Sequence, residues 1–252
     1  MNIPFQKITA IDFGMFQIHV WGLMVALGML AGLLITLKEA KKKKIDQTHV
    51  YDVFILMFIA SMIGSRILYV ILFWKYFAQD WSAIFRVWDG GLVYYGGFLA
   101  AVAVIWLYLK KHKLKFLKMA DIMAPGLALG LGIGRIGCYL IGDHLGAKTT
   151  FFLGSMFNGE LRHEPSLYLS LNGFMIFVIL MLLKKGLEKK EGAMTYTFLI
   201  LYGVTRFFLD YTRAFDISYF ADPRYFTLTI SQWISILLVV IFGPLLYKKL
   251  KK

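Results

Sequence analysis

Seven stretches of mostly apolar residues, each about 20 residues long, run along almost the whole chain. A helix of that length crosses the hydrocarbon core of a bilayer while satisfying its own backbone polar groups. Of the 252 residues, 59% are hydrophobic, which is typical of membrane proteins and not of soluble ones. The sequence therefore predicts one all-α, polytopic membrane domain over residues 1–252. Its seven transmembrane helices are expected at residues 18–37, 51–74, 91–109, 120–142, 167–183, 194–212 and 229–247.

Basic residues are distributed unevenly between the two sides of these spans. Of the 28 lysines and arginines, 18 are lysines in alternate connections and at the C-terminus, 7 lie in the other connections, and 3 lie within spans. Cytoplasmic loops of membrane proteins are rich in basic residues, so the lysine-rich side is predicted to be cytoplasmic. The N-terminus is then outside and the C-terminus inside, which seven spans allow. This arrangement explains the net charge of +13 without nucleic-acid binding.

Every arginine lies within a span or on the predicted outer side, and Arg135 is the most informative of them. It is near the end of an almost uncharged stretch, residues 122–142. Ionisable residues inside a membrane are functional-site candidates, and the planar guanidinium suits a phosphate. Gly134 and Gly137 leave the guanidinium uncrowded. The alternative is chance placement with snorkelling to the interface. The pattern predicts a site for an anionic lipid headgroup.

Four segments are expected near the outer leaflet, at residues 86–98, 134–146, 162–168 and 202–213. In the first, two Gly-Gly pairs flank Tyr94 and Tyr95. Such glycines either pack helices closely or form a backbone cradle beside a phenol. In the second, an ordinary polar loop is the alternative to a functional role for Asp143 and His144.

The last of these segments places two opposite charges on one helix face. Arg206 and Asp210 are spaced i, i+4, and Tyr202 lies one turn earlier on the same face. A charge pair inside a span implies a polar cavity or a bound partner. A purely structural ion pair is the alternative.

Taken in order along the chain, these motifs resemble the bacterial prolipoprotein diacylglyceryl transferase family, and the resemblance covers nearly all of it. The family signature Gly-Arg-x-Gly-Asn-Phe-x-x-x-Glu is matched by Gly134, Arg135, Gly137 and Asp143, with Cys138 at the asparagine position. Its His-Gly-Gly motif aligns with Tyr95, Gly96 and Gly97. Its Tyr-Gly-x-x-Arg-x-x-x-Glu motif aligns with Tyr202, Gly203, Arg206 and Asp210.

Four positions depart from the family pattern. A histidine, an asparagine and two glutamates of the family are here Tyr95, Cys138, Asp143 and Asp210. The aspartates keep the charge but shorten its reach by one methylene. A phenol ordinarily ionises near pH 10, so tyrosine is a poor base near neutrality unless nearby cations lower its pKa. The chain is either a divergent active branch or a paralogue with altered chemistry.

The resemblance implies transfer of a diacylglyceryl group from phosphatidylglycerol to the lipobox cysteine of prolipoproteins, with glycerol phosphate leaving. It also implies a multi-pass location in the bacterial cytoplasmic (inner) membrane. The implied catalytic residues are Arg135, Arg206, Tyr95, Asp143 and Asp210. The arginines would stabilise the charge that develops on phosphate oxygen, and the aspartates would orient the arginines. The tyrosine would donate a hydrogen bond to phosphate or help to deprotonate the thiol.

The remaining expectations concern substrate contacts and cofactors. The expected substrate-binding residues are Gly96, Gly97, Gly134, Gly137, Cys138, Gly146, Tyr202, Arg66 and Arg86. No metal cluster or nucleotide-binding loop is visible in the sequence, so neither a metal nor a cofactor is expected. The alternative function is a non-catalytic lipid-binding membrane protein or a transporter paralogue. Transporters more often contain internal repeats, and none is evident here.

Overall fold

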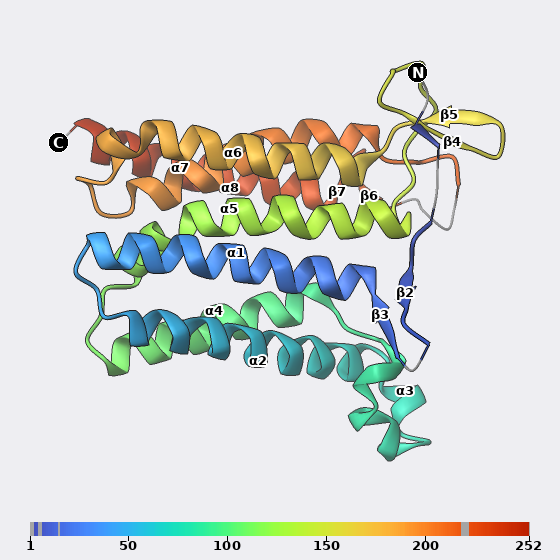
Figure 1. Ribbon diagram of the computed structural model, residues 1–252, viewed down its shortest axis with the longest axis horizontal. Helices are drawn as coiled ribbons and strands as arrows, with labels where there is room; N and C mark the ends of the chain where they lie inside the picture. The colour runs from blue at the N-terminus through green and yellow to red at the C-terminus, as the bar shows by residue number, and fades with distance from the viewer. Residues whose placement is uncertain (1–2, 5–6, 15, 218–221, 252) are drawn as a thin grey trace. The chain divides into compact units, whose positions relative to one another are not determined.

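The computed structural model describes residues 3–4, 7–14, 16–217 and 222–251. Most of them are helical, and seven long helices coincide with the seven apolar stretches (Figure 1). These helices are α1 (Val20–Lys42), α2 (Gln47–Leu72), α4 (Tyr94–Lys111), α5 (Phe116–Ile141), α6 (Pro165–Leu187), α7 (Ala193–Leu209) and α8 (Ile230–Lys251). Lysines occupy the last turns of α1, α4, α6 and α8. Their charge is favourable beside the negative end of the helix dipole, so these helices continue into the basic segments.

Five helices within the described residues are long and apolar enough to cross a membrane, namely α1, α2, α5, α6 and α8. The other two, α4 and α7, have 18 and 17 residues. At about 1.5 Å per residue they are about 26 Å long, slightly less than the roughly 30 Å hydrocarbon core. The chain is therefore a mostly helical, multi-pass membrane protein. That α4 and α7 also cross the membrane stays a prediction.

The chain divides into two compact units, which are described separately. The first unit comprises residues 1–36 and 120–252, and the second comprises residues 37–119. In the first unit α7 packs along both α6 and α8 (Figure 1). Its apolar core joins α5, α6 and α7 through side chains that include Ala128, Leu180 and Phe198.

Glycines bring α1 and α5 of the first unit into backbone contact. A methyl group on Gly28 would lie 2.7 Å from the carbonyl oxygen of Gly130. One on Gly126 would lie 2.5 Å from the carbonyl oxygen of Gly32. Small residues let helix backbones approach this closely in lipid, where van der Waals packing, and not hydrophobicity, favours association.

The second unit is built on α2 and α4, which also meet at glycines. A methyl group on Gly96 would overlap the carbonyl oxygen of Gly64 and lie 2.5 Å from the β-carbon of Leu68. One on Gly97 would lie 2.8 Å from the carbonyl oxygen of Ser61. This geometry favours close helix packing over a backbone cradle at the two glycines. The two helices are connected through three short helical pieces, α3 (Trp74–Phe77), η1 (Trp81–Phe85) and η2 (Val87–Asp89).

Short strands, none of which was predicted from the sequence, lie in the connections of the first unit. They are β1 (Ile3–Pro4), β2 (Ala10–Asp12), β3 (Gln17–His19), β4 (Ser155–Phe157), β5 (Glu160–Arg162), β6 (Arg224–Tyr225) and β7 (Leu228–Thr229). The sheet order β1-β4-β5 pairs β1 parallel to β4 and β4 antiparallel to β5, whereas β2-β3 and β6-β7 are hairpins. Strands of two or three residues are too short for an alternating pattern to stand out in a sequence.

Candidate active site

Arg135 lies on α5, less than two turns before the helix ends at Ile141. Its side chain is half-buried, and Nη1 lies 3.9 Å from the Sγ atom of Cys138, one turn further on. No carboxylate among the described residues forms an ion pair with it. The guanidinium is therefore left with donors that a ligand can use.

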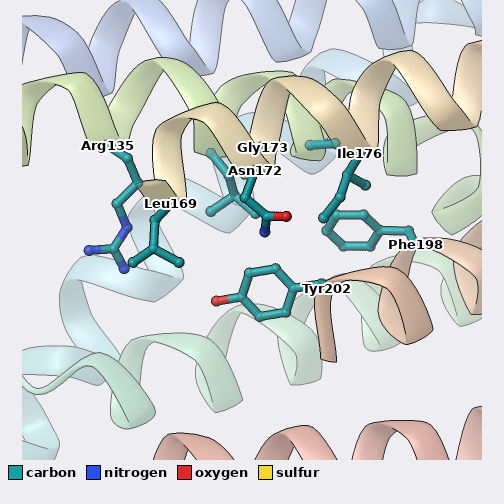
Figure 2. Close-up of a pocket in the computed structure, with 9 residues that line it drawn as sticks. Arg135, Leu169, Asn172, Gly173, Ile176, Phe198 and Tyr202 are labelled. Carbon is teal, nitrogen blue, oxygen red and sulfur yellow. The ribbon is translucent and has the colours of Figure 1, made fainter. Parts of the chain in front are cut away.

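A narrow pocket opens beside this guanidinium between α5, α6 and α7 (Figure 2). The hydroxyl of Tyr202 points toward the end where Arg135 lies, whereas Ile176 and Phe198 line the opposite end. Asn172 is buried between them, and its Oδ1 has no hydrogen-bond partner among the described residues. The cavity volume of about 10 Å³ is close to what one water needs, so a headgroup would have to widen it. A few polar groups on an apolar wall are typical of ligand sites.

Arg206 and Asp210 form the ion pair that their spacing predicted, with 2.9 Å between Nη2 and Oδ1. Both residues are buried, and Asp210 lies in the short helix η3 (Asp210–Thr212) that follows α7. The hydroxyl of Thr229 donates to Asp210, and Arg206 Nη2 donates to Ser231 at 3.0 Å. The second terminal nitrogen, Nη1, is buried without a hydrogen-bond partner among the described residues. A buried cationic donor without an acceptor is costly, which points to a ligand.

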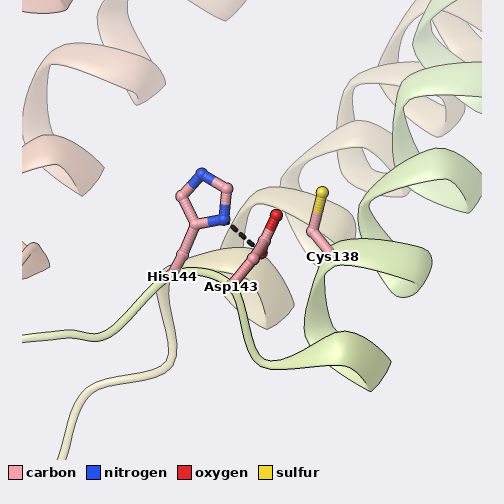
Figure 3. A group of neighbouring side chains, drawn as sticks. All are labelled: Cys138, Asp143 and His144. Carbon is pink, nitrogen blue, oxygen red and sulfur yellow. Dashed lines mark hydrogen bonds and ion pairs between the residues drawn. The ribbon is translucent and has the colours of Figure 1, made fainter. Parts of the chain in front are cut away.

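Asp143 and His144 follow α5 after a left-handed turn at Gly142, whose φ is 63°. The two side chains are bonded through His144 Nδ1 and Asp143 Oδ1, as Figure 3 shows. The sequence predicts that Asp143 orients Arg135. Among the described residues, however, Asp143 pairs with His144 and not with Arg135. The ligand atoms of Cys138, Asp143 and His144 lie within 4.8 Å of one another, which is close enough to hold a metal ion. The positive charge of the nearby Arg135 disfavours a metal cation at this position. The arrangement therefore favours the hydrogen-bonded pair of Asp143 and His144 over a metal site.

Glu164 lies in the predicted outer segment 162–168, although the sequence alone does not single it out as a site residue. It precedes α6, its side chain is almost fully buried, and Ser155 Oγ donates to Oε2 at 2.5 Å. Loss of water contact raises the pKa of Glu164 to about 7; the negative charge of Asp143 adds to the rise, and the Ser155 hydrogen bond opposes it. An acidic residue placed directly before the proline that begins an apolar helix is the signal that the sequence offered.

The loop that carries the predicted residue Gly146 is held by Arg162. The buried Arg162 guanidinium binds both oxygens of Asp216, at 3.0 and 2.6 Å, and donates to the Gly146 carbonyl at 3.1 Å. A methyl group on Gly146 would overlap the carbonyl of His163. Gly146 is therefore required for close backbone packing. Nothing in its surroundings indicates a contact with substrate.

The two glycines beside Arg135 have different surroundings. A methyl group on Gly134 would meet nothing within 4 Å, so space is open there for a ligand. One on Gly137 would lie 2.9 Å from the β-carbon of Met24, so Gly137 allows α1 to approach α5. Of these two predicted substrate contacts, only Gly134 has free space beside it.

Three more of the predicted residues, Tyr95, Arg66 and Arg86, belong to the second unit. Tyr95 is exposed at the start of α4, where its ring packs edge-on against Tyr94. Arg86 forms an ion pair of 2.6 Å with Asp80. Arg66 is buried, and its Nε and both terminal nitrogens donate to backbone carbonyls of residues 83, 84, 86, 90 and 91. This geometry favours a structural role for Arg66, and its contact with a headgroup stays a prediction.

Comparison with known proteins agrees with the resemblance seen in the sequence motifs. Residues 8–247 match the model of the prolipoprotein diacylglyceryl transferase family. A protein of Finegoldia magna is 34% identical over 245 residues, which cover 96% of each chain. One of Clostridioides difficile is 36% identical over 79% of this chain and 81% of its own. Both are named phosphatidylglycerol–prolipoprotein diacylglyceryl transferase. This chain therefore belongs to the prolipoprotein diacylglyceryl transferase family.

Proposed function

We propose that this chain transfers the diacylglyceryl group of phosphatidylglycerol to the lipobox cysteine thiol of prolipoproteins. The names of its relatives support this activity. The main structural support is Arg206, which has a buried guanidinium within an apolar helix. Its Nη1 has no hydrogen-bond partner among the described residues. Such a group suits a phosphate ester that gains charge as it leaves.

In this proposal Arg135 and Arg206 bind the phosphate and stabilise the charge that develops on its oxygens. Preorganised donors aimed at developing charge are usually the largest single catalytic contribution. Asp210 orients Arg206 through the ion pair. The attacking thiol comes from the prolipoprotein, so Cys138 is not needed as a nucleophile. Tyr202 lines the pocket beside Arg135, and the open space next to Gly134 leaves room for a ligand near the same arginine.

The test is incubation of the purified protein with phosphatidylglycerol and a lipobox peptide, followed by mass spectrometry for the thioether product. Arg135→Lys and Arg206→Lys should fold but lose about 10²–10³ in rate, because lysine lacks the planar fork of arginine. Arg224→Lys, at an exposed position, is the matched control and should remain active. Near-normal rates for both Arg135→Lys and Arg206→Lys would remove the two arginines from the mechanism. Failure of the wild type to form product would favour a lipid-binding or transport function.

The proposal includes a location and an orientation. The chain is one integral domain of the bacterial cytoplasmic membrane, with seven spans, its N-terminus outside and its C-terminus in the cytoplasm. The lysine-rich connections support this orientation. Reporter fusions after residues 45 and 115 should indicate the cytoplasm, and fusions near residues 80 and 155 should indicate the outer side. Inverted signals at two of these sites would contradict the orientation.

A further inference from the structure

We propose that His144, held by Asp143, is the general base that removes the proton from the substrate thiol. The inference rests on the proposed transferase function and adds a catalytic residue to it. The family histidine is replaced here by Tyr95, and a phenol is poorly suited to accept a proton at neutral pH. An imidazole is the side chain that does so readily.

The geometry of the pair defines which nitrogen is free. A carboxylate only accepts hydrogen bonds, so the contact between His144 Nδ1 and Asp143 Oδ1 places the proton on Nδ1. The lone pair is then on Nε2, which is the arrangement that a carboxylate maintains in other histidine bases. The side chains of His144 and Asp143 are 23% and 34% exposed. A substrate can therefore reach the imidazole, and Asp143 still restrains it.

The pair also lies beside the proposed phosphate site. Cys138 Sγ is within 4.8 Å of the ligand atoms of Asp143 and His144 (Figure 3), and Arg135 Nη1 lies 3.9 Å from the same sulfur. All four residues belong to the first unit. A base and a phosphate-binding cation are thus held at one end of α5. The displacement needs both near the same carbon atom.

The thiol gives its proton to His144 Nε2, and its sulfur bonds to the glyceryl carbon that carries the phosphate ester. The bond from that carbon to the ester oxygen breaks, and the electron pair leaves with glycerol phosphate. The proton on the imidazole then passes to solvent. Asp143 keeps its negative charge throughout and acts as a positioning residue.

The experiment measures thioether formation by full-length wild type, His144→Ala, His144→Gln and His19→Ala in detergent. A missing general base costs about 10²–10⁴ in turnover, so both His144 variants should lose activity to that extent with little change in the phosphatidylglycerol KM. Added imidazole should restore part of the His144→Ala rate. The exposed His19 lies in the same unit, so His19→Ala should match the wild type. Asp143→Asn should lower turnover and shift its pH profile, whereas Asp143→Glu should recover part of the rate.

Each outcome has a distinct meaning. A folded and fully active His144→Ala would overturn the inference while leaving the transferase function intact. Loss of activity in both His144 variants without imidazole rescue would also overturn it, since a structural role predicts that result. Inhibition of the wild type by a chelator, reversed by Zn²⁺, would replace the general base with a metal site. Absence of thioether product from the wild type would remove the function itself, and the inference with it.

Discussion

The ion pair between Arg206 and Asp210 allows folding and chemistry to be separated. At 2.9 Å the attraction between two unit charges is about 6 kcal/mol for an effective dielectric constant of about 20. Desolvation of both groups offsets much of it, yet removing one partner leaves a buried, uncompensated charge. That change typically costs about 3–5 kcal/mol. Asp210→Asn and Arg206→Gln should therefore each destabilise the protein by this amount.

The double variant, Arg206→Gln with Asp210→Asn, removes both charges and keeps amides that can bond to Ser231 and Thr229. It should recover most of the lost stability, with an interaction energy of about 3 kcal/mol or more in the double-mutant cycle. Thermal unfolding in detergent, followed by tryptophan fluorescence, measures the stability, and thioether formation measures the chemistry. We expect the double variant to be folded and inactive. Additive stability losses would refute the buried ion pair, and an active double variant would refute the phosphate-binding role.

Three further predictions concern packing, pH and helix capping. Gly96→Ala should lower the unfolding free energy by about 1–3 kcal/mol, because its methyl group overlaps the backbone of α2. Gly134→Ala should leave the unfolding free energy unchanged, and equal melting temperatures for the two variants would contradict this. The pKa of Glu164 is raised from 4.5 to about 7, so the free energy of unfolding should fall by at most about 3 kcal/mol as pH rises from 4.5 to 7. Melting curves of Glu164→Gln should lack that fall. Asp121→Ala should cost about 2 kcal/mol in thermal unfolding, because Asp121 accepts three hydrogen bonds at the start of α7; an unchanged melting temperature would contradict this.

The positions of the helices could be predicted because they depend on local properties. A bilayer leaves no water for backbone groups, so a long apolar stretch has to satisfy them within its own helix. The i, i+4 pairing of Arg206 with Asp210 was predictable for the same reason, since one helix turn determines it. Similarly, the Pro165 that begins α6 acts within a single turn.

The contacts that define the site are long-range, and only the tertiary structure decided them. Arg66 and Arg206 are both arginines in apolar spans, and sequence alone made both candidates for phosphate. The carbonyls that occupy Arg66 come from residues 17 to 25 positions away, whereas Arg206 retains a buried nitrogen with no described partner. Which loop returns to which helix depends on the whole path of the chain. The sequence alone therefore determined where charges lie along the helices, and tertiary packing decided which of them are left for a ligand.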